Sequence, residues 1–99
     1  MKIKGIRHVG IETRNLKKMI SFYEDLGMTL FYDKTVKPKG LKQKIKMVKL
    51  VSKDGSVIEL TQGHINSYHI AFDTDNKEDL IWLKDPDGNL LEIVNEKLL

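Results

Sequence analysis

Two histidines and two glutamates stand at matching places in an internal repeat, and together they could bind a metal ion. His8 and His69 lie in one pair of similar apolar segments, and Glu59 and Glu92 lie in another pair. Each glutamate lies four residues after the glycine of an Asp-Gly pair, and the residues on either side of the glutamate are apolar. Two imidazoles and two carboxylates suit one divalent ion such as Zn²⁺, Ni²⁺, Co²⁺, Mn²⁺ or Fe²⁺. The repeat therefore predicts a metal site formed by these four side chains.

The composition offers few other side chains that could act as nucleophiles or metal ligands. With 0 Cys, the chain has no disulfide, no thiolate ligand and no cysteine nucleophile. The third histidine, His64, has no counterpart in the repeat and is interpreted as a surface residue. A single histidine or glutamate in a strand is usually exposed or hydrogen-bonded in the core, so only the matched positions support a functional interpretation.

The elements that hold these residues follow from the spacing of apolar side chains. Residues 6–13 alternate as in a strand, and apolar residues recur at helical spacing over 16–26, between an Asn15 cap and Gly27. Strands are also predicted over 29–36, 41–51 and 56–62, and then over 68–72, 80–84 and 89–95. The predicted fold class is α+β, with a βαβββ module followed by a second module of the same type that lacks its helix and one strand.

The length of the chain limits its organisation. At 99 residues and 11.4 kDa it has room for one core. We expect a single domain, with module one at residues 1–62, a linker at 63–67 and the shortened module two at 68–99. No apolar run approaches the roughly 18 residues of a membrane span, and no apolar segment follows the first lysines. The expected location is cytoplasmic, with no membrane partner.

A lysine-rich stretch occupies the middle of the chain. Eight lysines and no acidic residue occur between Lys34 and Lys53. The stretch contains no arginine and no aromatic residue, which argues against a nucleic-acid interface. A solvated surface is the favoured interpretation. The lysines could also surround the opening of a site for an anionic small molecule, or meet the acidic face of a partner.

These motifs together resemble the vicinal oxygen chelate superfamily of glyoxalases, extradiol dioxygenases, methylmalonyl-CoA epimerases and bleomycin-resistance proteins. The resemblance rests on four segments: IRHVGI at 6–11, the helix with its Phe22-Tyr23 and Leu26-Gly27 pairs, YHIAF at 68–72, and DPDGNLLE at 85–92. It implies two modules that curl into an incomplete barrel around one divalent metal. The metal ligands implied by the resemblance are His8, Glu59, His69 and Glu92.

The presence of Glu59 makes the chain more similar to the glyoxalase and epimerase branch than to the dioxygenases, whose set is two histidines and one glutamate. This resemblance implies a metal-dependent lyase or isomerase, with Glu92 as the catalytic base and Glu59 as a ligand or second base. The alternative is a non-catalytic small-molecule binder of the antibiotic-resistance type, and a third possibility is a structural metal site. Further substrate contacts are assigned to Glu12, Thr61, Tyr68 and Trp82. The shortened module leaves sheet uncovered, which predicts a homodimer.

Overall fold

The computed structural model describes residues 1–37, 42–63 and 68–98. In these residues the chain forms one helix and seven strands. In chain order the elements are β1 (Ile3–Glu12), α1 (Leu16–Asp25), β2 (Thr29–Val36), β3 (Ile45–Val51), β4 (Val57–Gln62), β5 (His69–Thr74), β6 (Leu80–Lys84) and β7 (Leu90–Asn95).

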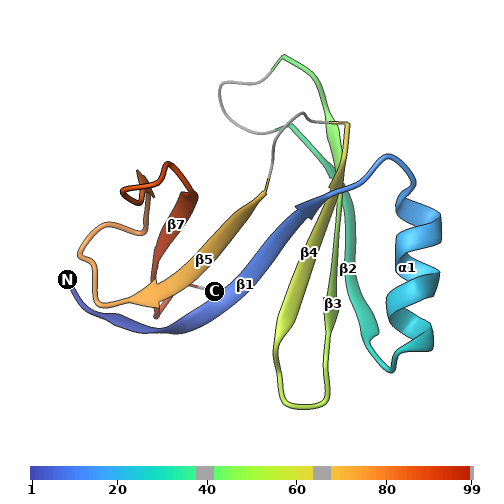
Figure 1. Ribbon diagram of the computed structural model, residues 1–99, viewed down its shortest axis with the longest axis horizontal. Coiled ribbons are helices and arrows are strands. Elements are labelled where there is room, and N and C mark those ends of the chain that lie inside the picture. Colours follow the sequence, from blue (N-terminus) through green and yellow to red (C-terminus); the bar gives the residue numbers. More distant parts are fainter. Residues whose placement is uncertain (38–41, 64–67, 99) are drawn as a thin grey trace.

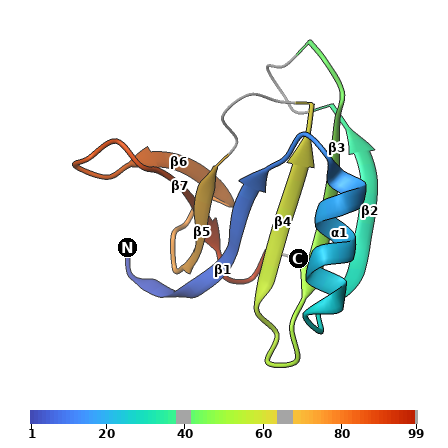
Figure 2. The same ribbon diagram turned by 45° about the vertical axis from the view of Figure 1, so that its right-hand side comes forward.

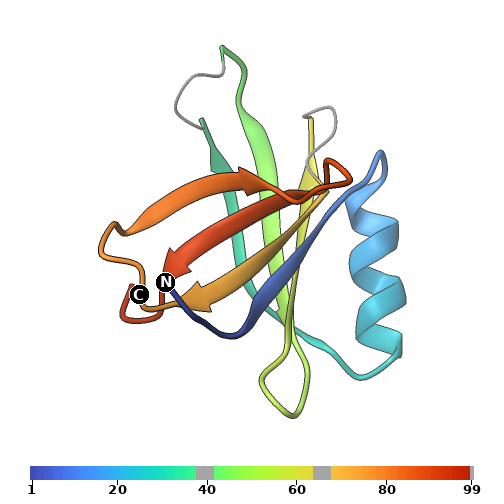
Figure 3. The same cartoon turned by 60° about the vertical axis from the view of Figure 1, so that its left-hand side comes forward.

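All seven strands belong to one mixed sheet with the order β2-β3-β4-β1-β5-β7-β6. The central pair, β1 and β5, is antiparallel and joins two similar halves. In each half the first strand pairs in parallel with the last, β1 with β4 and β5 with β7, and an antiparallel strand follows outward. The sheet bends along the central pair, so that the two halves turn toward each other (Figures 1 and 3).

Helix α1 covers one face of the first half, which we call the outer face. The helix begins where the Asn15 side chain accepts a hydrogen bond from the Lys18 amide. It ends at Asp25, and Gly27, just beyond the Leu26 cap, has a φ of 99°, the left-handed conformation that favours glycine. The helix lies against the sheet of the first half (Figure 2). A buried cluster of side chains packs between them. Its members are Leu16, Val48, Leu50 and Leu60. The opposite face of the sheet is called the inner face.

The second half has no helix in the part of the chain that the structure describes (Figure 2). It consists of β5, β6 and β7, which confirms the α+β class and the loss of one helix and one strand. Strand boundaries differ from the prediction at some ends. β1 begins at Ile3, and β3 begins at Ile45 rather than at residue 41, which lies outside the described residues.

Helix α1 is ten residues long, and among the described residues no helix is both long and apolar enough to cross a membrane.

Candidate metal centre

Strand register places the four predicted ligands on the inner face, on both sides of the central strand pair. Cross-strand partners in a sheet point to the same face and lie close together. The register forms two short rows there, Glu59–Gly10–His69 and His8–Ala71–Glu92. Each row contains one histidine, one glutamate and, between them, one residue with little or no side chain. The two rows are adjacent because positions 8 and 10 are neighbours on the same face of β1.

The small residue in each row leaves room for the histidine of the other half. A Cβ atom added to Gly10 would lie 2.1 Å from Cε1 and 2.3 Å from Nδ1 of His69. Ala71, the partner of His8, is fully buried. Small residues beside candidate ligands would ordinarily leave space for a metal ion and substrate. The structure shows that the space beside Gly10 is taken by the imidazole of the other half.

A β-bulge determines that His8 points inward. β1 pairs Ile6 with Phe72 and His8 with Ala71, so Arg7 is an extra residue in β1. Because side chains alternate along a strand, one extra residue moves His8 to the face opposite that of Ile6. The Arg7 guanidinium donates hydrogen bonds to Asp73, at 3.0 Å, and to the backbone carbonyl of Leu98, at 2.7 Å. These bonds tie the bulge to β5 and to the end of the chain.

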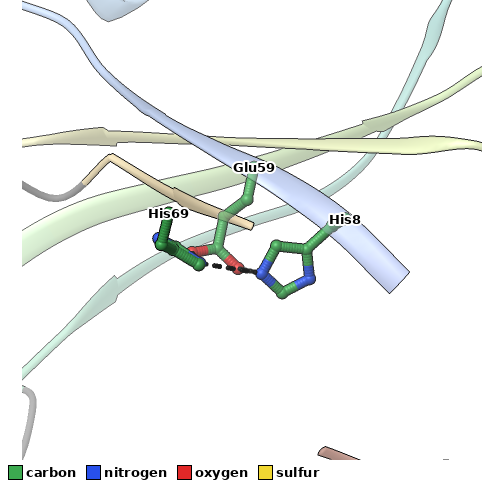
Figure 4. A group of neighbouring side chains, drawn as sticks. All are labelled: His8, Glu59 and His69. Carbon is green, nitrogen blue, oxygen red and sulfur yellow. Dashed lines mark hydrogen bonds and ion pairs between the residues drawn. The ribbon is translucent and has the colours of Figure 1, made fainter. Parts of the chain in front are cut away.

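The side chains of His8, Glu59 and His69 converge on a small volume (Figure 4). His8 Nε2 lies 3.0 Å from His69 Nε2, 3.3 Å from Glu59 Oε2 and 3.4 Å from Glu92 Oε1. His69 Nε2 lies 3.9 Å from Glu59 Oε1. The structure thus brings all four predicted residues together, although they come from four strands spread over most of the chain.

Burial controls the protonation of this cluster. The side chains of His8, His69 and Glu59 are 8%, 7% and 9% exposed, and that of Glu92 is 14% exposed. Desolvation lowers the pKa of His8 to about 4, helped by the nearby charges of His69, Lys49 and Arg7. Desolvation raises the pKa of both glutamates, and for Glu92 the charge of Glu59 adds to the effect. The His8 imidazole is therefore neutral at pH 7, which is the form that binds metals.

The donor set fits a divalent transition metal. His8, Glu59 and His69 each offer a ligand atom, and these three atoms lie within 4.8 Å of one another, so one ion can contact all three. Imidazole and carboxylate donors suit Zn²⁺, Ni²⁺, Co²⁺, Mn²⁺ and Fe²⁺. Burying the two carboxylates without an ion is unfavourable, because desolvation disfavours their charged form. A bound cation would offset this cost.

The other predicted site residues lie around this cluster. Trp82 is the cross-strand partner of Glu92, and its ring centroid lies 5.4 Å from that of His69. Thr61 and Glu12 are cross-strand partners on the inner face, two residues further along β4 and β1 than Glu59 and Gly10. The Tyr68 hydroxyl donates a hydrogen bond to the Glu12 carbonyl, at 3.3 Å, and thus binds the backbone of β1. His64 lies outside the described residues.

Sequence reasoning did not single out Lys49, which the structure places beside the site. Lys49 is the partner of Glu59 across the β3–β4 hairpin, and its charge acts on the pKa of His8, Glu59 and Glu92. The signal for this pairing is the turn between the two strands. Lys49 and Glu59 lie at equal distances along the chain on either side of Asp54, at the centre of the turn, so the hairpin register alone brings them face to face.

Comparisons with known proteins agree with this fold and cluster. A model of the Glyoxalase/Bleomycin resistance protein/Dioxygenase superfamily matches residues 5–81, more than half of the sequence, and the chain belongs to this superfamily. The match includes His8, Glu59 and His69 and ends before Glu92. The superfamily comprises metal-dependent enzymes as well as binding proteins.

A glyoxalase family protein from Bacillus cereus, known from its crystal structure, has a similar fold. It is 17% identical, with a TM-score of 0.58, and the alignment covers 96% of this chain and 95% of that one. This similarity concerns the fold alone. No curated protein matches the chain at a significant level.

Proposed function

We propose that the protein is a divalent-metal-dependent lyase or isomerase of the glyoxalase and epimerase type, acting on a small substrate with vicinal oxygens. The observation that carries this proposal is the convergence of His8, Glu59, His69 and Glu92, from four different strands, on one buried point. Neither a structural hydrogen-bond network nor a simple apolar core requires two imidazoles and two carboxylates in contact at the junction of two half-sheets.

Within this proposal the two glutamates have different roles. Glu59 belongs to the group of three whose ligand atoms lie within 4.8 Å of one another, whereas Glu92 contacts the group through His8. Glu92 is also the more exposed of the two. We assign Glu59 as a ligand and Glu92 as the base that accepts a proton from the substrate carbon next to a carbonyl and returns it at the product carbon.

The proposed chemistry divides between the protein and the ion. When bound, a divalent ion would polarise the carbonyl oxygen and so acidify the neighbouring C–H bond. Burial raises the pKa of Glu92, which strengthens this carboxylate as a base and lets it hold the transferred proton. Trp82, half exposed beside His69, supplies an aromatic surface for the substrate. Thr61 and Glu12 are the proposed polar contacts on the other side.

Metal content per chain tests the proposal first. Mass spectrometry of untagged protein is expected to find near-stoichiometric metal, taken up from the host or after incubation with Ni²⁺, Co²⁺ or Zn²⁺. The Glu59→Ala, Glu92→Ala double variant is expected to lose it. A Glu24→Ala, Glu96→Ala double variant removes the same charge from exposed positions and should retain the metal. Loaded protein is then assayed with 2-oxoaldehyde hemithioacetals and acyl-CoA epimers.

The same measurements separate the alternatives. A folded parent that takes up no metal removes the enzyme proposal and favours a metal-free small-molecule binder. Stoichiometric metal without turnover, together with unfolding on chelation, favours a structural metal site.

We also propose a homodimer and a cytoplasmic location. Among the described residues, no helix covers the outer face of the second half. An apolar cross-strand row on this face runs from Val9 in β1 to Leu83 in β6, and these two side chains are 38% and 42% exposed. Light scattering is expected to give twice the 11.4 kDa chain mass, and Leu83→Lys is expected to shift the protein toward monomer. A monomeric parent at micromolar concentration would contradict the dimer.

A further inference from the structure

Two lysine ammonium groups meet at one aromatic ring on the inner face of the first half. Lys49 Nζ lies 4.8 Å from the centroid of the Tyr32 ring, and Lys34 Nζ lies 5.3 Å from the same centroid. Both distances are within the range of cation–π attraction. The Tyr32 and Lys49 side chains are half-buried and Lys34 is exposed, so part of the cluster is open to solvent.

The row of cross-strand partners that contains Glu59, Gly10 and His69 extends through β3 and β2 into this cluster. Tyr32 is the partner of Lys49 in the β2–β3 pair, and Lys49 is the partner of Glu59 in the β3–β4 pair. The inner row therefore includes, in order, Tyr32, Lys49, Glu59, Gly10 and His69. Lys34 lies in the adjacent row, opposite Met47. The cluster thus begins one strand away from the candidate metal ligands.

A second β-bulge points Tyr32 to this face. β2 pairs Leu30 with Leu50 and Tyr32 with Lys49, which makes Phe31 an extra residue. Leu30 packs on the helix side, and without the bulge Tyr32 would point the same way. The bulge exposes Phe31, 53% accessible, and brings the Tyr32 ring to the lysines.

Across residues 1–37, 42–63 and 68–98, neither ammonium group forms a close ion pair with a carboxylate. Glu59 is the direct neighbour of Lys49 and interacts with its charge only at longer range. Two like charges beside one ring repel each other, and a divalent cation at the neighbouring ligands would add to this repulsion. An anion between the lysines and that cation would be attracted by all three.

We infer that the substrate carries an oxyanion, a carboxylate or a phosphate group, that binds to Lys49 and Lys34 beside the Tyr32 ring while its vicinal oxygens face the metal ligands. This inference rests on the proposed function and narrows its substrate class. Ammonium groups form strong charge-assisted hydrogen bonds with both kinds of oxyanion. Of the lysine-rich stretch, only Lys34 and Lys49 are assigned to this subsite, and its other described lysines are exposed to solvent.

The first test uses metal-free protein and inorganic phosphate at constant ionic strength. NMR is expected to show saturable shifts of the Tyr32 ring and Lys49 side-chain signals, and the dissociation constant should rise about tenfold in a Lys34→Gln, Lys49→Gln variant, a loss of about 1.4 kcal/mol. Lys46→Gln is the control for removing a lysine from the opposite face of the same strand. Lys46 is also in β3, but it shares the face of Val48, which is buried under α1, so its replacement should leave phosphate binding unchanged.

The second test uses Ni²⁺-loaded protein and two hydroxamates of equal chain length, butyrohydroxamic acid and succinic monohydroxamic acid. Both chelate a metal through vicinal oxygens, and only the second adds a carboxylate. Calorimetry is expected to show about tenfold tighter binding of the carboxylated probe to the parent and to Lys46→Gln, and equal binding of both probes to the double lysine variant.

The outcomes separate the two proposals. If the parent takes up no Ni²⁺ but phosphate still shifts the Tyr32 and Lys49 signals, the oxyanion subsite stands and the metal-dependent function falls. If both hydroxamates bind the loaded parent equally, or phosphate binds the double variant as tightly as the parent, the oxyanion subsite is wrong while the metal centre is unaffected. Equal melting temperatures of the parent and the variants exclude an effect on folding.

Discussion

Gly10 and His69 are partners in the central strand pair, and the imidazole of His69 fills the space into which any other residue at position 10 would place its Cβ. The distance from that Cβ position to the ring is 2.1 Å, well below van der Waals contact. The obstacle is a buried ring in contact with Glu59 and His8, so it has little freedom to move aside. The glycine is therefore part of the candidate metal centre although it contributes no ligand atom.

Replacing Gly10 tests this relationship. Gly10→Ala is expected to displace His69 and to weaken metal binding roughly 10- to 100-fold, the range found for residues that orient ligands. Gly5→Ala is the control, because Gly5 lies in the same strand and an added Cβ there meets nothing within 4 Å. Metal titration of both variants gives the comparison. Equal affinities for parent and Gly10→Ala would contradict the assigned role.

Trp82 offers a direct signal of metal binding. It is the only tryptophan of the chain, and its ring centroid lies 5.4 Å from that of His69. Binding of Co²⁺ or Ni²⁺, whose open d shells quench fluorescence at short range, is expected to reduce the tryptophan emission saturably. Zn²⁺, with a filled d shell, should compete away this effect without comparable quenching. A His69→Gln variant should show no saturable quenching, and quenching that persists in it would place the metal elsewhere.

The buried glutamates are expected to lower the stability of the metal-free protein. Because desolvation raises the pKa of Glu59, its charged form is unfavourable in the fold at pH 7. Glu59→Gln should therefore stabilise the metal-free protein by on the order of 1 kcal/mol, about 4–8 °C in melting temperature, and should remove most of the stabilisation by added metal. Thermal unfolding with and without Zn²⁺ measures both effects, with exposed Glu96→Gln as control. A metal response unchanged by Glu59→Gln would exclude this ligand.

The lowered pKa of His8 makes the stability of the metal-free protein depend on pH. The imidazole binds a proton near pH 6.5 when unfolded and only near pH 4 when folded, so the unfolded state binds more protons between these values. The His8 contribution to stability is thus lost as the pH falls from about 6.5 to about 4. The raised pKa values of Glu59 and Glu92 act in the opposite direction.

A His8→Gln variant isolates this contribution, because both glutamates remain. The free energy of unfolding of the parent is expected to fall relative to that of the variant by on the order of 2 kcal/mol between pH 7 and pH 4. Chemical denaturation at several pH values, in the presence of a chelator, provides the measurement. Parallel pH profiles would show that His8 is not desolvated in the fold.

The secondary structure was largely predictable because its signals are local. Asn15 and Gly27 bound α1 through hydrogen bonds and a left-handed φ that depend on near neighbours, and the Asp54-Gly55 turn brings β3 and β4 together in one register. The repeat also predicted which four side chains would meet, because equivalent positions in two similar halves lie symmetrically about the junction between them. For these features the sequence was sufficient.

Tertiary structure decided which way several inner side chains point. The bulges at Arg7 and Phe31 each reverse the alternation of a strand, and they exist only because β1 pairs with β5 and β2 with β3. With strict alternation, Ile6 and His8 would point to the same face of the sheet, and so would Leu30 and Tyr32. In the fold, the two residues of each pair point to opposite faces. The sequence by itself determined the types of the candidate ligands and the strands that carry them. The contacts of Gly10 with His69 and of Tyr32 with Lys49 required long-range pairing, because the spacing of residues within one strand does not specify the register of its partner.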